Sequence, residues 1–286
     1  MAIPIIHDWK KYFTYPDEGL GSSYERVVIN NVIRSLVERY GVETILETPS
    51  FGFTGMSGIN LMNEALAGRK IALEDNERER LDLVADLWTE TGLSLNAVMN
   101  PDYRKLEYVD KAFDMAFNFS ALWFVSDLKE FLSELTRVTD KVIMLSVPNR
   151  SGIGFKLQMK DYDPGKYPEL HPQFIDTRSI EFIMGKLGWI KEQSGYFDCP
   201  PWPDIGMSKE DFLAKTIGLK RDLTEQNKPA RADSAKKALT ILDHYKGKEP
   251  DFPQRMQKFY FLERLAPVWF KRVWAHHYYM IFVPHA

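Results

Sequence analysis

The sequence predicts a doubly wound α/β fold with a mostly parallel seven-stranded sheet and a helical insertion before the last strand. Two observations predict this fold. Short apolar segments alternate with longer amphipathic segments from residue 43 onward, as in strand–helix–strand units with right-handed crossovers. The first two expected strands also end in carboxylates, and in an open α/β sheet the carboxyl ends of strands form ligand sites.

Residue spacing predicts each element in turn. In the first helix, Val28, Val32 and Leu36 recur every four residues and Gly41 stands at the stop. Gly68 and Gly92 end the next two helices in the same way, and short apolar runs between the helices indicate strands. The expected helices are 24–40, 56–67, 76–91, 127–138 and 177–187, and the expected strands are 43–48, 70–74, 94–99, 113–119, 141–147, 189–197 and 275–283.

The distribution of aromatic residues, glycines and prolines divides the chain into three regions. Residues 1–23 are aromatic and turn-rich and predict an irregular arm, while residues 24–206 and 273–286 form the expected core. Residues 207–272 read as an interrupted helical insertion, because prolines break its pattern. Within the core, residues 148–176 read mostly as loop, since they are rich in glycine, proline and tyrosine.

Composition and net charge limit the classes of protein and partner that we expect. The chain has 286 residues, 44% of them apolar and 27% charged, which is typical of a soluble globular protein. A net charge of -3 gives no general reason to expect nucleic acid or an anionic membrane as a partner. Residues 209–272 carry 15 Lys/Arg against 9 Asp/Glu, so this stretch is either a mildly basic face or an ordinary solvated surface.

The number of cysteines and the N-terminal residues indicate the cellular compartment that we expect for this protein. Cys199 is the only cysteine, so no internal disulfide or cysteine-based metal cluster can form, and we expect a buried thiol there. The N-terminal residues lack the apolar core of a signal peptide, and no run is long enough to span a membrane. We therefore expect a cytoplasmic protein without a membrane partner, and a homo-oligomer is left open.

Two segments carry a family resemblance. Residues 109–118 contain the pair Phe113-Asp114 followed by apolar residues, and residues 122–138 end in Glu-Leu-Thr-Arg-Val. A later strand ends in Val147-Pro148-Asn149. In this order and content the chain resembles the class I S-adenosylmethionine-dependent methyltransferases, in their small-molecule branch, over about residues 24–198 and the last strand. The resemblance implies a Rossmann-like sheet and S-adenosylmethionine as cofactor.

The resemblance also implies a set of cofactor-binding positions. The family's first strand ends in an acid, matched by Glu47, and is followed by a glycine-rich loop, from which this chain departs because Pro49 replaces the first glycine. A polar residue after the third strand faces the adenine in the family, and the end of the fourth strand borders the methyl-transfer site. The matching positions are Glu47, Pro49, Gly52, Gly55, Glu74, Asp75, Asn100, Asp102, Asn118, Phe119 and Ser120.

Glu74 and Asp75 compete for the ribose-binding role. A carboxylate accepts two hydrogen bonds from vicinal hydroxyls, so either residue suits a ribose. Side chains alternate along a strand, so only one of the two should face the site, and we favour Glu74. Asp75 suits a capping role for the helix that follows.

An oxygen or nitrogen nucleophile can require a general base in direct attack on the sulfonium methyl. The expected candidates are His171, Asp198 and Tyr24. His276 and His277 are adjacent on an expected strand, so they face opposite ways and cannot form a metal pair unaided; no metal is expected.

The leading hypothesis is a methyltransferase that acts on a small molecule, with residues 207–272 as a lid over the pocket. A methyltransferase for RNA or protein that docks through the basic insertion is one alternative, although we do not expect a nucleic-acid partner. A catalytically silent module for binding or assembly is another, motivated by Pro49. A dinucleotide oxidoreductase fits less well, because the glycine spacing for a pyrophosphate is missing.

Overall fold

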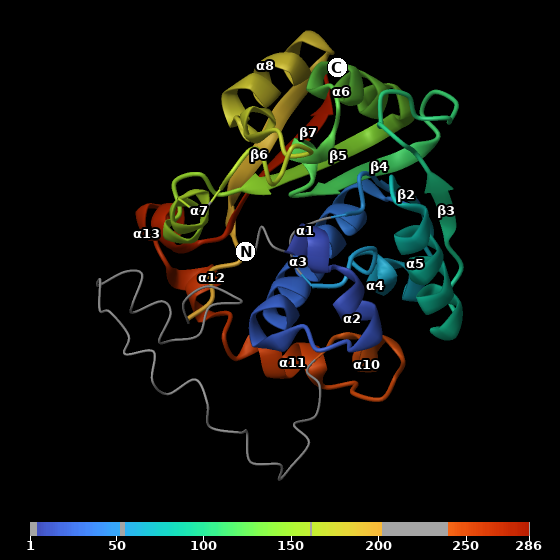
Figure 1. Ribbon diagram of the computed structural model, residues 1–286, viewed down its shortest axis with the longest axis vertical. Coiled ribbons are helices and arrows are strands. Elements are labelled where there is room, and N and C mark those ends of the chain that lie inside the picture. The colour runs from blue at the N-terminus through green and yellow to red at the C-terminus, as the bar shows by residue number, and fades with distance from the viewer. Residues whose placement is uncertain (1–4, 52–54, 161, 202–239, 286) are drawn as a thin grey trace.

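A seven-stranded sheet with helices on both faces forms the centre of the computed structural model (Figure 1). The structure describes residues 5–51, 55–160, 162–201 and 240–285. The strand order is β3-β2-β1-β4-β5-β7-β6, and β7 is antiparallel to both neighbours. The strands are β1 (Thr44–Glu47), β2 (Lys70–Asp75), β3 (Asn96–Met99), β4 (Phe113–Phe119), β5 (Thr139–Pro148), β6 (Trp189–Phe197) and β7 (His277–Pro284). The predicted doubly wound α/β fold is confirmed.

Two apolar clusters fix the helices on opposite faces of the sheet. One cluster joins β1, β2 and β4 to α3 (Gly19–Tyr40), α5 (Arg78–Glu90) and the short helices α4 (Met62–Leu66), α10 (Leu242–Tyr245) and α11 (Phe252–Gln257). The other packs α6 (Leu128–Val138), α8 (Thr177–Lys186), η1 (Leu122–Phe124) and η2 (Pro172–Ile175) on the opposite face. Figure 1 shows α6 and α8 on one side of the sheet and α3, α4 and α5 on the other.

Two regions contain elements that the sequence prediction missed. The expected irregular arm contains α1 (Ile5–Asp8), α2 (Lys10–Thr14) and the first turn of α3, which begins at Gly19. The expected loop at residues 148–176 contains α7 (Ile153–Met159) and η2. Each of the missed separate elements spans seven residues or fewer, too short for a clear 3.6-residue period in the sequence.

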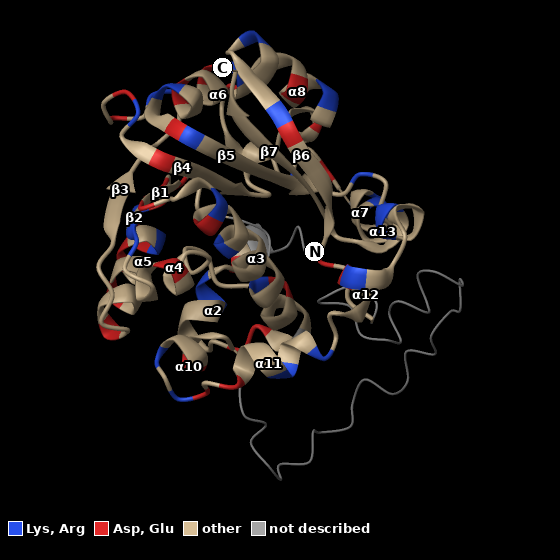
Figure 2. Ribbon diagram, turned by 180° about the vertical axis from the view of Figure 1, so that it is seen from behind, with Lys and Arg blue, Asp and Glu red and all other residues tan. Residues whose placement is uncertain are grey.

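The expected insertion lies partly outside the described residues, because residues 202–239 are not described. Residues 240–274 form α10, α11, α12 (Phe261–Leu265) and α13 (Val268–Trp274), and α11 packs on α3. Figure 2 shows basic and acidic segments together around α10 and α11. Within the described part of the chain, no helix is long and apolar enough to cross a membrane.

Candidate functional site

The carboxyl ends of β1, β2 and β3 meet because these strands pair in parallel. Glu47 aligns with Leu73, and Asp75 aligns with Met99. The backbone N–H of Ser50 donates to the carbonyl of Glu74 at 2.9 Å, and that of Asn100 donates to the carbonyl of Asp75 at the same distance. The loops after β1 and β3 therefore close over the end of β2.

Glu74 is fully buried and bonded to both neighbouring strand ends. Thr48 Oγ1 donates to its Oε2 at 2.8 Å and Asn100 Nδ2 donates to the same oxygen at 3.1 Å. No described residue makes a hydrogen bond of standard geometry to its Oε1, although the Tyr108 hydroxyl lies close enough to act on the carboxylate. Burial raises the pKa of Glu74 to about 7 against the lowering effect of these donors.

Asp75 is saturated by the chain itself. Arg80 donates to its two oxygens from Nε at 2.8 Å and Nη2 at 2.5 Å. Ser50 Oγ adds a third bond at 3.0 Å, and the Glu77 backbone N–H a fourth at 2.8 Å. The Phe51 ring lies 3.9 Å from the Arg80 guanidinium and covers this pair. The capping role considered for Asp75 is wrong, because α5 begins at Arg78 with Glu77 at its N-cap and no side-chain capping bond. The bond from the Glu77 backbone instead holds the turn before the helix.

The Glu47 carboxylate is hydrogen-bonded to the segment that follows β1. Asn60 Nδ2 donates to its Oε1 at 2.6 Å, and Asn60 in turn accepts from Arg26. Arg26 also pairs with Glu18 at 3.1 Å, and all four side chains are buried. Burial raises the pKa of Glu47 to about 7, with Asn60 and Arg26 acting in the opposite direction.

Further predicted cofactor-binding positions lie in the loops after β1 and β3, and only some of them are near Glu74. Pro49 follows a cis peptide bond, and Gly52 lies outside the described residues. Gly55 has φ +59°, and a Cβ there would lie 2.1 Å from Glu18 Oε1, so the loop approaches the start of α3 closely. Asn100 turns inward to Glu74, whereas Asp102 is exposed and pairs with Arg104. Of these two, Asn100 is the residue at the site.

These groups suit the ribose of an adenosyl cofactor on chemical grounds. A ribose diol offers two hydroxyl donors, and the fully buried Glu74 carboxylate has one oxygen with spare acceptor capacity. Thr48 and Asn100 already fix the orientation of that carboxylate. The geometry therefore fits S-adenosylmethionine, with Glu74 rather than Asp75 as the residue that would accept from the ribose.

The end of β4 carries the last three predicted positions. Asn118 Nδ2 donates to the carbonyl of Thr48 at 2.7 Å, so it ties β4 to the segment after β1. Phe119 packs against the His277 ring at 4.7 Å between centroids. Ser120 adopts a left-handed conformation, with φ 51°, and its Oγ lies 2.8 Å from His277 Nδ1.

Ser120 is the first member of a buried polar cluster at this end of the sheet. His277 Nε2 lies 3.0 Å from Glu25 Oε2, so one imidazole links β4 to α3. Next to it, His276 Nδ1 lies 2.6 Å from Asp198 Oδ2, and Asp198 also has a left-handed φ of 59°. We call Ser120, Glu25, Asp198, His276 and His277 the histidine cluster; none of the five is more than 7% exposed.

Two of the three predicted base candidates lie at this end. Asp198 is in the histidine cluster, and Tyr24 lies beside it with its hydroxyl 3.5 Å from Glu263 Oε1. Burial raises the pKa of Tyr24 and of Asp198. His171 is elsewhere: its backbone N–H donates to the carbonyl of Trp123 and its ring packs on Phe174.

Cys199 follows Asp198 and is buried, as expected. Its backbone N–H donates to the Glu263 carboxylate. Burial raises the pKa of the Cys199 thiol to about 12 and that of Glu263 to about 7. The thiol is therefore protonated near neutral pH and suits a structural role.

Sequence reasoning missed Glu25 and His277 as site residues. They are 252 residues apart and meet only because β7 inserts between β5 and β6. The pair His276-His277 was the available signal. The two rings lie 6.4 Å apart at 82° and contact different carboxylates, as alternation along a strand requires.

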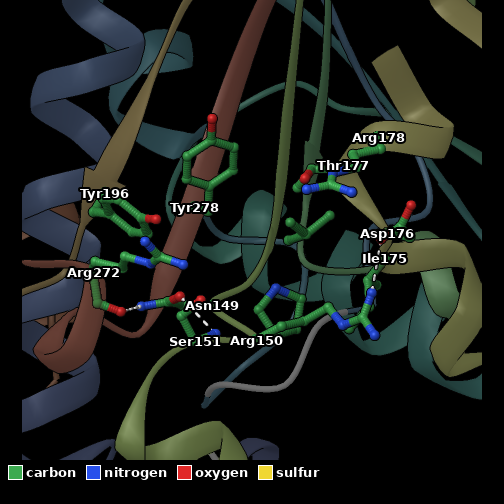
Figure 3. A pocket seen from close by; sticks show the side chains of 12 residues that line it. Asn149, Arg150, Ser151, Ile175, Asp176, Thr177, Arg178, Tyr196, Arg272 and Tyr278 are labelled. Atoms are coloured by element: carbon green, nitrogen blue, oxygen red, sulfur yellow. Dashed lines mark hydrogen bonds and ion pairs between the residues drawn. The ribbon is translucent and has the colours of Figure 1, made fainter. Parts of the chain in front are cut away.

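A separate open cavity of about 500 Å³ lies at the end of β5 (Figure 3). Arg150, Arg178 and Arg272 reach it from three segments, and Tyr196 and Tyr278 stack edge to face beside it at 5.0 Å. Arg150 already pairs with Asp176 at 2.9 Å. The cavity is cationic. It could not be predicted from the sequence, because its arginines are far apart along the chain.

Comparisons with known proteins support the methyltransferase domain and the fold. Residues 57–142 match the family model described as a methyltransferase domain. A search of curated proteins finds no match. Among solved structures, the MccD protein shares 11% identity at a TM-score of 0.51, covering 89% of this chain and 96% of that one.

Two further structures are similar at TM-scores below 0.5. A putative sarcosine dimethylglycine methyltransferase from Galdieria sulphuraria has 11% identity and a TM-score of 0.49, over 89% of this chain and 84% of the other. The magnesium protoporphyrin IX methyltransferase from Synechocystis PCC 6803, solved with bound S-adenosylhomocysteine, has 15% identity and a TM-score of 0.48, over 64% and 78%.

The fold and the domain match define the class of protein. The sheet is the methyltransferase form of the Rossmann-like sheet, with an antiparallel strand inserted near its end. Residues 57–142 form a methyltransferase domain, and the chain is an enzyme whose cofactor is S-adenosylmethionine.

The raised pKa values predict a pH-dependent stability. Glu47, Glu74 and Glu263 have pKa values of about 7 when folded and 4.5 ordinarily. The folded chain therefore keeps protons that the unfolded chain releases between these values. The stability from these groups is present below about pH 4.5 and is lost as the pH rises to about 7.

Urea unfolding of the cofactor-free chain between pH 5 and 8 measures this effect. The midpoint should fall with rising pH, and Glu74→Gln should flatten the slope because the amide does not titrate. Asp114 and Glu134 have lowered pKa values, so their contribution changes only at more acidic pH and serves as an internal reference. A midpoint that rises from pH 5 to 7 would contradict the assignment.

Proposed function

We propose that this methyltransferase transfers the methyl group of S-adenosylmethionine to a small-molecule acceptor by in-line attack on the sulfonium methyl. The observation that supports a functioning cofactor site is the buried Glu74 carboxylate with an acceptor oxygen in reserve. It favours cofactor binding over a role in assembly alone, because a buried carboxylate is costly unless a ligand or a donor completes its hydrogen bonds.

The chain's own residues would hold the two reactants at adjoining strand ends. When bound, the cofactor supplies an electrophilic methyl group that needs positioning and exclusion of water more than activation. Glu74 would accept from the ribose hydroxyls, and Asn100 would face the adenine side. The acceptor would lie at the end of β4, where Asn118 ties β4 to the segment after β1.

The histidine cluster borders this acceptor position. It could take up a proton from an oxygen or nitrogen nucleophile, because each of its two imidazoles lies within hydrogen-bonding distance of a carboxylate. Of the predicted bases, Asp198 and Tyr24 have the position for such a role, and His171 does not. Of the expected lid, α12 lies beside this position, because its Glu263 contacts Tyr24 and the backbone of Cys199.

Isothermal titration calorimetry at pH 8 tests the cofactor site, because Glu74 is then ionised. S-adenosylmethionine or S-adenosylhomocysteine should bind with a dissociation constant on the order of micromolar. Glu74→Gln should weaken binding about tenfold or more, because hydrogen bonds to a charged group contribute about 1.5–3 kcal/mol.

Glu64→Gln is the matched control. Glu64 is another buried glutamate with a raised pKa, but it lies on α4 and bonds its neighbour Asn63. It should leave cofactor binding unchanged. The cofactor proposal is wrong if the parent chain binds neither compound, or if both variants weaken binding equally.

A further inference from the structure

We propose that Glu25, Asp198 and His277 form a binding site for one first-row transition-metal dication such as Zn²⁺, Mn²⁺ or Fe²⁺. The three residues come from α3, the end of β6 and the start of β7, and each offers a ligand atom within 4.8 Å of the other two. This proposal replaces the sequence expectation of no metal. That expectation considered only a pair of adjacent histidines, whereas the structure supplies two carboxylates from distant segments.

The distances suit a single ion. An ion at the centre of a triangle with sides of 4.8 Å would lie about 2.8 Å from each corner, and metal–ligand bonds to nitrogen and oxygen are about 2.0–2.2 Å. One side of this triangle is shorter, since His277 Nε2 and Glu25 Oε2 are 3.0 Å apart. Side-chain adjustments below about 1 Å would complete the coordination.

The burial of two neighbouring carboxylates favours a cation between them. Glu25 and Asp198 are both 0% exposed, and two carboxylates so close in a dry interior repel each other. Asp198 Oδ1 is buried and accepts no hydrogen bond within the described part of the chain. A bound dication would satisfy both observations.

The surrounding bonds resemble the outer shell of a metal centre. A ligating histidine normally uses its other ring nitrogen for a hydrogen bond that orients it, and ligating carboxylates are bonded in turn. Here His277 Nδ1 lies 2.8 Å from Ser120 Oγ, and Asp198 Oδ2 lies 2.6 Å from His276 Nδ1. Ser120 and His276 would therefore act as positioning residues.

The ligand types select the class of ion. One imidazole nitrogen with two carboxylate oxygens suits Zn²⁺, Mn²⁺ or Fe²⁺ better than a soft ion such as Cu⁺ or an all-oxygen ion such as Mg²⁺. Three protein ligands also leave at least one position of a four-coordinate ion for an outside ligand. The metal site itself does not depend on the proposed acceptor.

Elemental analysis of the metal content of the full chain, expressed in medium with added Zn²⁺ and Mn²⁺, tests the site. We expect about one equivalent of metal per chain, because the ligands are fully buried and exchange should be slow. His277→Ala and Glu25→Gln should each lose most of it. His171→Ala removes a histidine outside the cluster and should retain the full equivalent.

Metal addition to the chelator-treated parent chain keeps the test valid if a variant fails to fold. Zn²⁺ or Mn²⁺ in large excess should raise the melting temperature by about 5 °C or more, while Mg²⁺ should not. The proposal is overturned if the parent chain carries no metal and neither Zn²⁺ nor Mn²⁺ changes its melting temperature. That result would leave two histidine–carboxylate pairs as the complete cluster. Cofactor calorimetry is a separate readout, so either proposal can fail alone.

Discussion

Asp75→Asn should lower the free energy of unfolding by about 3–5 kcal/mol, because it leaves the buried Arg80 guanidinium without its counter-ion. Arg80 is 4% exposed and Asp75 is 0% exposed, so water cannot replace the lost charge. The asparagine also gives up one of the acceptors that Ser50 and the Glu77 backbone use. Equilibrium urea unfolding of the cofactor-free chain measures the difference.

The same helix offers a matched control. Arg78 and Asp82 form an exposed pair at 3.4 Å, with side chains 69% and 63% exposed. Asp82→Asn should change stability by less than about 0.5 kcal/mol, as for other exposed helical pairs. The double variant Asp75→Asn/Arg80→Met should recover part of the loss, since no buried charge then remains unpaired. An Asp75→Asn chain within 1 kcal/mol of the parent would contradict this account.

Trp88→Ala should cost a similar amount, about 3–5 kcal/mol, through the cavity left by a fully buried indole. Trp88 Nε1 also donates to the Gly58 carbonyl at 2.8 Å, and so fastens the segment after β1 onto α5. A Cβ on Gly58 would lie 2.6 Å from Val84 Cγ1, so this contact is already close. Loss of the indole should therefore also weaken cofactor binding, which calorimetry would detect.

Two further tryptophan substitutions serve as controls. One separates the effect of the cavity from that of the hydrogen bond, and the other tests the effect of burial. Trp88→Phe keeps most of the ring but leaves the Gly58 carbonyl unbonded, which should cost about 1–3 kcal/mol. Trp269→Ala removes a tryptophan that is 71% exposed and should stay within about 0.5 kcal/mol of the parent. Equal losses for Trp88→Ala and Trp269→Ala would show that burial does not explain the effect.

The strands could be predicted well because their patterns are strong. The bounds expected for β4 and β6 are those observed, and the other strands differ by at most two residues at either end. Except for β6, whose centre is polar, the strands are mostly apolar segments bounded by polar or glycine residues. The helix after β1 is shorter than expected, beginning at Met62 rather than residue 56. The segment before it is held by Arg26 and Trp88, which the local sequence does not reveal.

The candidate site could be predicted in part. Alternation along β2 predicts different surroundings for Glu74 and Asp75, and their side chains do bond to different partners. The ribose role favoured for Glu74 stays a prediction. The sequence also placed Asp198 and Ser120 near the site. It could not show that Arg80 neutralises Asp75, nor that Glu25 meets His277, because such pairs depend on tertiary packing.

The position of β7 has a consequence for assembly of the site during folding. β5 and β6 both pair with β7 and not with each other, so the sheet stays split until residues 277–284 insert between them. His277 arrives with that insertion, and its contact with Glu25 spans 252 positions of the chain. Contacts so distant in sequence form slowly. The histidine cluster should therefore be among the last parts to acquire native structure, after the β1–β4 half that holds Glu74.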